Sequence, residues 1–253
     1  MSRHEHSYYA SATLVRMELT TREAAARLGV SQARVRALIN SGGLTARRVG
    51  TLWLIDAASI EHQHSLTTAG ATSRAMSPRI AWAAADLADG GTAAWLSATE
   101  RSRLRRRLSG SPEIDAVRRW MSRRASSIHH YKVGPKDLTA LLTDCRAVRT
   151  GISAVESYHL GLGTGGDADI YISSEDLGQL VRGYVLLPSS RGNLTVRIDD
   201  GDLHRAATRT IDGRVVVPRM IAGADLADDT DARTRSAGRR LLAAVMDERR
   251  WER

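Results

Sequence analysis

Side chains suited to reading DNA are concentrated in one short stretch of the chain. Gln32, Arg34 and Arg36 carry the amide and guanidinium groups that hydrogen-bond to base edges. On a helix, at about 100° per residue, the two arginines lie on the flanks of a face whose centre holds Ala33 and Ala37. Small side chains at that centre let the backbone approach a groove closely. The pattern therefore favours a DNA contact.

Two short helices are needed to position these side chains. Thr20 or Thr21 can cap the first helix, which has Glu23 in its first turn. Its inward positions are Ala24, Ala25 and Leu28, and Gly29 ends it. Ser31 then caps a second helix, in which Val35, Leu38 and Ile39 have the spacing of a buried face. The second helix is the one predicted to read the DNA.

A two-stranded wing is predicted after this helix pair. Arg47, Arg48 and Val49 precede a Gly50-Thr51 turn, and residues 52–55 form the apolar return strand. The residues predicted to contact DNA are Thr21, Ser31, Gln32, Ala33, Arg34, Arg36, Arg47, Arg48 and Thr51.

This stretch resembles the excisionase-like and MerR-like winged helix-turn-helix family. The residues that carry the resemblance are 21–25, 28–31, 35, 38–39, 43–44, 48–50 and 53–55. It implies a DNA-binding domain of about 45 residues. Family members usually have polar or basic residues where this chain has Leu52 and Leu54, so the wing face with these leucines is expected to pack on protein. The alternative is a small helical domain that contacts protein.

Length and charge allow a second domain and a polyanionic partner. The chain has 253 residues, a net charge of +9 and 35 arginines against two lysines. The net charge is +3 over residues 1–64, +8 over 65–150 and −2 over 151–253. Cys145 is the single cysteine, and the sequence has neither a secretion signal nor a long apolar run. We expect a soluble, cytoplasmic protein.

The predicted fold class is α+β with two domains. Residues 1–16 are predicted to be a mobile tail, 17–64 the winged helix-turn-helix domain, 65–77 a linker and 78–253 an α+β domain. The last domain is divided into a helical, arginine-rich part (78–145) and a mixed part with a small sheet (146–253). Helices are predicted at 78–87, 97–108, 112–124, 136–142, 174–181 and 231–250, and strands at 129–133, 148–155, 169–172, 184–188, 194–198 and 215–218.

Nine arginines fall within residues 101–124. Arg118, Arg119, Arg123 and Arg124 are expected on the outside of their helix. The candidate phosphate contacts are Arg103, Arg106, Arg107, Arg119 and Arg123. Two helices with solvated outer faces would show the same residues, and the sequence leaves both interpretations open.

Two short motifs match the sequence patterns of enzyme sites in part. Residues 161–166 fit G-x-G-x-x-G, but the helix that a dinucleotide site requires does not follow them. Asp167 and Asp169 have the spacing of a nucleotidyltransferase metal pair, without a recognisable Gly-Ser turn or third carboxylate. We expect no catalytic residues, no metal and no cofactor, and hence no enzyme.

The C-terminal half resembles the AbiEi-type antitoxins of type IV toxin–antitoxin and abortive-infection systems. The matching residues are 77–80, 146–153, 176–181, 185–188, 192–197, 224–226 and 237–242. The resemblance implies a repressor of its own operon that also counteracts a nucleotidyltransferase-like toxin. The alternative is a transcription regulator whose second domain binds a small ligand or mediates dimerisation. In either case a homodimer or several copies on operator DNA are expected, since one helix-turn-helix supplies few base contacts.

Overall fold

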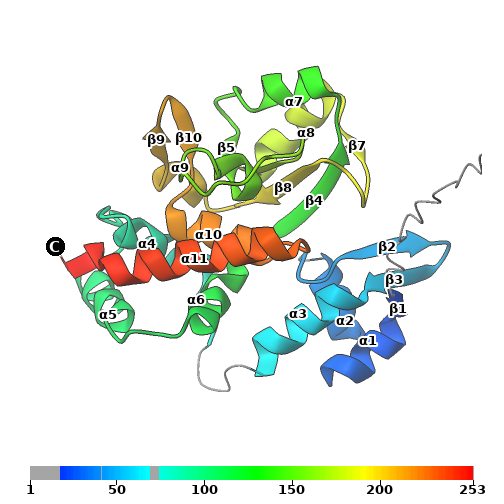
Figure 1. The fold of residues 1–253 in the computed structure, drawn as a ribbon, viewed down its shortest axis with the longest axis horizontal. Coiled ribbons are helices and arrows are strands. Elements are labelled where there is room, and N and C mark those ends of the chain that lie inside the picture. Colours follow the sequence, from blue (N-terminus) through cyan, green and yellow to red (C-terminus); the bar gives the residue numbers. More distant parts are fainter. Residues whose placement is uncertain (1–17, 41, 69–73, 253) are drawn as a thin grey trace, which may run out of the picture.

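The computed structural model describes residues 18–40, 42–68 and 74–252. They form a small N-terminal domain and a larger second domain, side by side along the long axis of the molecule (Figure 1). The tail predicted at 1–16 lies outside the described residues.

The N-terminal domain is built from a helix pair and a three-stranded antiparallel sheet. Its elements are β1 (Glu18–Thr20), α1 (Thr21–Leu28), α2 (Gln32–Asn40), β2 (Ala46–Val49), β3 (Leu52–Asp56) and α3 (Ala57–Thr68). The strand order is β1-β3-β2, so a strand that was not predicted pairs with the return strand of the wing. Helix α3 ends at Thr68, inside the segment predicted to be a linker from residue 65.

The predicted caps of the helix pair are confirmed. The Thr20 hydroxyl accepts the Glu23 N–H at 3.3 Å, and the Glu23 carboxylate accepts the Thr20 N–H at 2.8 Å. Gly29 ends α1 in the left-handed conformation, with φ 65°. The core between helices and sheet includes Ala24, Val35 and Ile55, each fully buried. These contacts hold α2 by one face and leave its other face in solvent.

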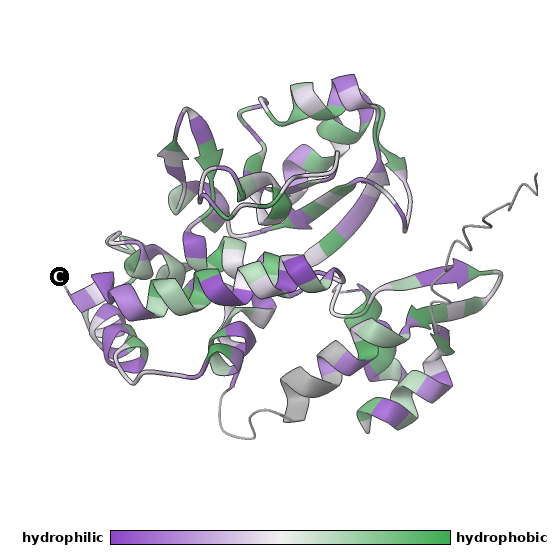
Figure 2. Cartoon of the chain, in the orientation of Figure 1, coloured by the Kyte–Doolittle hydropathy of each residue, from purple (hydrophilic) through white to green (hydrophobic). Residues whose placement is uncertain are grey.

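The second domain contains a larger sheet with helices on both faces. Its helices are α4 (Pro78–Ala88), α5 (Ala98–Leu108), α6 (Ile114–Trp120), α7 (Pro135–Leu141), α8 (Ser174–Gly183), α9 (Leu203–Ala206), α10 (Arg219–Ala227) and α11 (Ala232–Glu248). Helices α7 and α8 pack on one face of the sheet, and α4, α10 and α11 pack on the other. Single 3-10 turns are η1 (Met121–Arg123), η2 (Gly151–Ala154) and η3 (Arg250–Glu252). Figure 2 shows hydrophilic and hydrophobic residues alternating along α11, as expected for a helix with one solvated face.

The sheet is larger than predicted and joins both halves of this domain. Its strands are β4 (Ser127–Lys132), β5 (Val148–Thr150), β6 (Ala168–Ile172), β7 (Leu187–Pro188), β8 (Leu194–Ile198), β9 (Arg209–Ile211) and β10 (Arg214–Val216). The order β7-β4-β8-β6-β5-β10-β9 places β4 beside β8, its antiparallel partner. A strand from the part predicted to be mainly helical thus pairs within the sheet of the mixed part, so the two parts share one sheet.

Two predicted strands were too long, and three elements of the second domain were missed. The predicted strand 148–155 ends at Thr150, where the chain turns into η2. Of residues 184–188 only the last two pair in the sheet. Strand β9 and helices α9 and α10 were not predicted. In each case the apolar run is short and its local pattern does not separate strand from helix.

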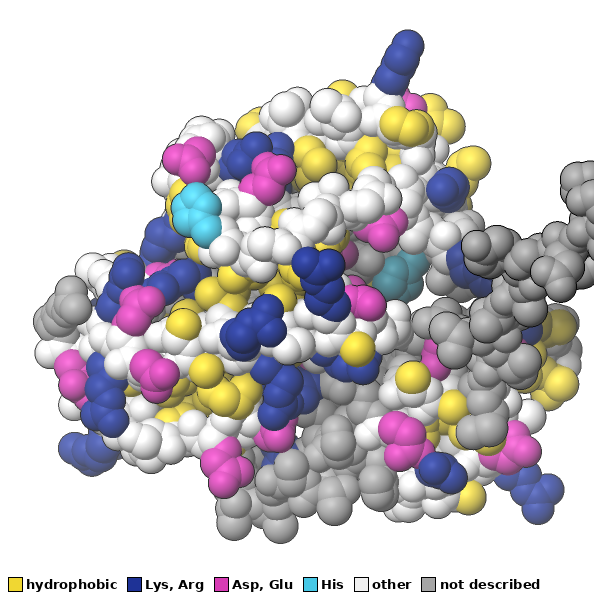
Figure 3. Space-filling view, viewed as in Figure 1, with side chains coloured by type: hydrophobic (Ala, Val, Ile, Leu, Met, Phe, Trp, Pro, Cys, Tyr) yellow, Lys and Arg dark blue, Asp and Glu magenta, His cyan; other side chains and the backbone are white. Residues whose placement is uncertain are grey.

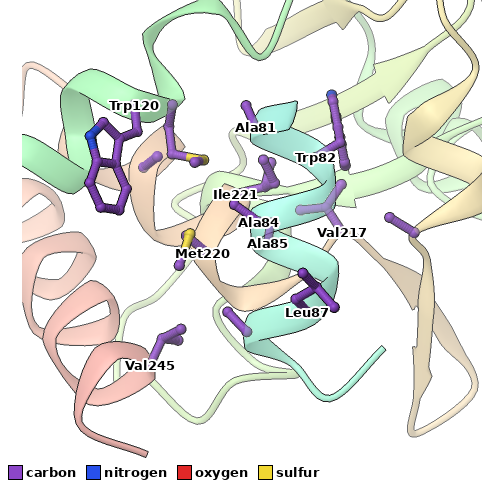
Figure 4. Packing of buried hydrophobic residues seen from close by; sticks show 14 of the residues in the cluster. Ala81, Trp82, Ala84, Ala85, Leu87, Trp120, Val217, Met220, Ile221 and Val245 are labelled. Carbon is purple, nitrogen blue, oxygen red and sulfur yellow. The ribbon is translucent and has the colours of Figure 1, made fainter. Parts of the chain in front are cut away.

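Alanine-rich α4 lies at the centre of the main core. Every residue from Ala81 to Ala88 is buried. Figure 4 shows Ala84 and Ala85 facing Met220 and Ile221 of α10 across this core. Helix α10 in turn packs closely on α11. A Cβ added at Gly238 of α11 would lie only 2.4 Å from the backbone nitrogen of Ala227 in α10, so only glycine fits there. Small residues thus let the backbones of α10 and α11 approach closely.

A buried network of charges joins these helices to the sheet. Arg124 donates to Asp225 of α10 at 2.7 Å and to Asp228 at 2.7 Å. Arg197 of β8 pairs with the same Asp225 at 3.0 Å and with Asp169 of β6 at 3.8 Å. We call these five residues the ion network. Burial alone would lower the pKa of Arg124, but the carboxylates of Asp225 and Asp228 outweigh it and raise that pKa well above its ordinary value.

Two arginines of this region were expected on the outside of their helix but are buried. Arg124 is 5% exposed, and so is Arg118, which donates to the carbonyl of Ala227 at 3.1 Å. Arg118 also pairs with nearby Asp115 at 3.2 Å, but Asp225 and Asp228 lie about a hundred residues further along the chain, so the helical pattern alone could not place the two arginines. Neither side chain is free for a nucleic acid.

Replacing Asp225 by alanine should strongly destabilise the second domain. The change leaves Arg124 and Arg197 buried without their shared carboxylate, a loss on the order of 3–5 kcal/mol. Chemical denaturation of the full chain measures this loss of unfolding free energy. The exposed Asp247→Ala is the matched control and should change stability by less than about 0.5 kcal/mol. Equal effects of the two substitutions would show that the ion network contributes nothing.

The protonation of Asp169 should be visible in the pH dependence of stability. Burial raises the pKa of this carboxyl to about 6, while Arg197 opposes the rise. A raised pKa means that the folded state holds the proton more tightly than the unfolded chain. The resulting stabilisation is complete below about pH 4 and is lost as the pH rises through about 6, on the order of 3 kcal/mol.

Asp169→Asn separates this contribution from those of other groups. As the pH rises from about 4 to about 6, the unfolding free energy of the wild type should fall relative to that of the variant. A difference that stays constant over this range would mean that Asp169 remains ionised in the folded protein.

Candidate nucleic-acid interface

Helix α2 presents its polar and small residues to solvent. Gln32, Ala33, Arg34 and Arg36 are all exposed, whereas Val35 is 0% exposed. The Ser31 hydroxyl accepts the N–H of Arg34 at 3.2 Å and so fixes the first turn of the helix. The residues predicted to contact base edges therefore share one open surface.

The beginning of α1 is less accessible. Thr20, not Thr21, supplies the capping hydroxyl, and Thr21 at the first helical position is half-buried. Its backbone N–H at the helix N-terminus suits a phosphate, as the position does in many helix-turn-helix domains.

The two arginines predicted on the wing lie in different environments. Arg47 forms a paired ion contact with Glu18 of β1, with nitrogen–oxygen distances of 2.7 and 2.5 Å. Arg48 is exposed, and its Nε donates to the carbonyl of Gly50 at 3.2 Å, which directs the side chain along the wing. Thr51 lies exposed at the tip. Arg48 and Thr51 are thus better placed than Arg47 to meet a phosphate.

The leucine face of the wing has two environments. Leu52 near the tip is 59% exposed and does not pack on protein. Leu54 is half-buried and, with Arg47 and Glu18, borders a small cavity closed by Ser190 and Arg191 of the second domain. The expectation of packing therefore fails for Leu52, while Leu54 lies beside the second domain.

The five candidate phosphate contacts of the second domain are not equivalent. Arg107 lies over the ring of Trp120 at 4.6 Å and donates to the carbonyl of Arg74 at 3.0 Å. Arg103 and Arg106 are exposed on α5, at the end of the second domain far from α2 (Figure 1). Arg119 is half-buried, and Arg123 is exposed on η1. In Figure 3 basic side chains on the second domain are interspersed with acidic ones instead of forming one large patch.

A cavity of about 770 Å³ lies between the two domains and was not predicted. The N-terminal domain contributes Arg34, Ala37 and Leu38 of α2, together with Thr45 and Ser59. Opposite them the second domain contributes residues around η1 and the turn after α10. The domains touch beside it, since a Cβ at Gly42 would lie 2.5 Å from the Ile128 side chain. No local sequence pattern signals such a cavity, because it depends on how two domains pack.

The two enzyme-like motifs lie just before β6 and at its start. Residues 161–166 form a loop that leads into β6, so a strand and not a helix follows this loop directly. Asp169 belongs to the ion network, and Asp167 is exposed. Within the part of the chain that the structure describes, no three His, Cys, Asp or Glu side chains are grouped as metal ligands.

Comparison with known proteins supports the N-terminal assignment. A family model described as "Helix-turn-helix domain" matches residues 18–62. Neither the search of curated proteins nor the search of solved structures returned a match. Among the described residues no helix has the length and apolar character needed to cross a membrane. The matched segment coincides with the capped helix pair and its three-stranded sheet, so residues 18–62 are a helix-turn-helix domain of the kind found in DNA-binding regulators.

Proposed function

We propose that the protein is a sequence-specific repressor that reads operator DNA with α2. The observation that carries the proposal is the exposed surface of Gln32, Ala33, Arg34 and Arg36 on a helix held rigidly from behind. A helix of this kind enters the major groove, where guanidinium and amide groups distinguish base pairs. Arg48 on the wing adds a sequence-independent phosphate contact. The protein acts in the cytoplasm without catalysing a reaction.

We further propose that the second domain gives the repressor an antitoxin role. The support is the resemblance of residues 78–253 to AbiEi-type antitoxins, whose cognate toxins are nucleotidyltransferase-like. Most of the resembling segments lie in parts of α4, β5, α8, β8, α10 and α11, which contribute to the two hydrophobic clusters of the domain. The partner is then a toxin made from the same operon.

A second candidate function is a regulator that responds to a small ligand. The interdomain cavity favours it, since about 770 Å³ lies in the range of ligand sites and Arg34 of the reading helix lines it. A ligand held there would change DNA affinity by thermodynamic linkage. Dimerisation on the operator is compatible with both functions, because one helix-turn-helix supplies few base contacts.

Arg36→Ala and Arg48→Ala should affect DNA binding differently. Arg36 lies on the reading helix, so its loss should cost about 1–3 kcal/mol of preference for the operator over a scrambled duplex. Loss of Arg48 should weaken both duplexes equally and reduce the salt slope of binding by about one.

Mobility-shift titrations over a range of salt concentrations measure both quantities, with DNA from upstream of the gene as operator. Arg182→Ala, an exposed arginine on α8, is the matched control and should leave affinity and slope unchanged. Unchanged discrimination in Arg36→Ala would remove α2 from base reading.

The antitoxin role is tested by co-expression of the full chain with the neighbouring open reading frame. If that frame encodes the toxin, its expression alone should arrest growth and co-expression should restore it. The Arg36→Ala variant, expressed from a foreign promoter, should restore growth equally well, because α2 is not part of the second domain. Arrest that persists with wild-type chain present would refute the antitoxin role and leave the repressor untouched.

A further inference from the structure

The two flanks of α2 face different surroundings. A helix in the major groove has a phosphate strand along each side. Arg36 lies on the flank that is open to solvent, whereas Arg34, with Ala37 and Leu38, lines the interdomain cavity. The strand on the Arg34 side must therefore run through the space between α2 and the second domain.

The second domain offers donors suited to phosphate at this point. Ser122, Arg123 and Ser126 line the cavity opposite Arg34. Arg123 is exposed, and its guanidinium forms no ion pair or hydrogen bond with another described residue. Ser122 is also exposed. Arginine and serine side chains both donate hydrogen bonds to DNA phosphates.

The direction of Arg123 is fixed by its neighbours. Met121 is fully buried in the main core, and Arg124 is tied into the ion network through Asp225 and Asp228. With residues on both sides held inward, Ser122 and Arg123 are left on the cavity side of η1. The backbone that carries these two donors is thus held in place, while the exposed Arg123 side chain loses conformational freedom when a phosphate binds.

Acidic residues in the cavity modulate its charge without cancelling it. Asp228 is neutralised by Arg118 and Arg124, at 3.4 and 2.7 Å. Asp229 is half-buried and lines the cavity, and its carboxylate accepts the backbone N–H of Asp231. Arg34, Arg123 and Arg235 outnumber it. The cavity therefore attracts an anion, and Asp229 limits that attraction.

We propose that Ser122, Arg123 and Ser126 bind the phosphate strand that flanks α2 on its Arg34 side, so that the second domain contacts the operator beside the reading helix. The proposal rests on the proposed reading of DNA by α2 and assigns a second contact to it. It selects Arg123 among the five candidate arginines and excludes Arg103 and Arg106, which lie on α5 away from the cavity.

The salt dependence of operator binding tests the proposal in the full chain. Arg123→Ala should weaken operator and scrambled duplex by the same factor and reduce the slope of log affinity against log salt by about one. Arg103→Ala is the matched control and should leave the slope unchanged. Asp229→Asn should act in the opposite direction and increase affinity for both duplexes, and Arg123→Lys should keep most of the slope. Thermal unfolding of each variant confirms that it is folded.

The outcomes separate this inference from the proposed function. If the wild type prefers the operator and Arg36→Ala removes that preference, while Arg123→Ala and Asp229→Asn both bind like wild type, the second domain does not contact DNA and only the inference is overturned. If the wild type binds no duplex at low salt, both the inference and the repressor function fail.

Discussion

The ion network holds the second domain in its observed form. Its central carboxylate, Asp225, is completely buried and serves two arginines, Arg124 from the helical layer and Arg197 from the sheet. Thr150 and Tyr171 donate hydroxyl hydrogen bonds to the same carboxylate. Desolvating these charges is costly, and the cost is offset only when every partner is in place. The network therefore fixes the helices on the sheet in one arrangement, where apolar packing among many alanines would tolerate several.

The same network links the core to the surface that faces α2. Arg124 immediately follows η1, so the charges that fix the helical layer also fix the direction of Ser122 and Arg123. On the other side of the cavity, Ser31 and Val35 hold α2. Helix α2 and η1 thus border one space between the domains. DNA binding and any effect of a partner on the second domain would be coupled through this space.

The sequence predicts the N-terminal domain well because its signals are local. The cap at Thr20, the stop at Gly29 and the spacing of Val35, Leu38 and Ile39 each depend on neighbouring residues only, and the structure and the family model agree with them. The second domain depends on distant partners. Arg118 and Arg124 were expected in solvent, because nothing near them in sequence reveals carboxylates about a hundred residues away. The pairing of Arg47 with Glu18 and the interdomain cavity were missed for the same reason.

Site-directed cross-linking tests the central claim, that the exposed face of α2 lies in the major groove, most directly. Ala33 lies at the centre of that face, and exposed Cys145 can be replaced so that Ala33→Cys supplies the single thiol. An operator duplex carries a thiol tether on a base edge, in the major groove in one sample and in the minor groove in another. A disulfide cross-link to the major-groove tether alone is the expected result. Retained operator binding without that cross-link, or an equal cross-link to the minor-groove tether, would show that α2 does not read the DNA.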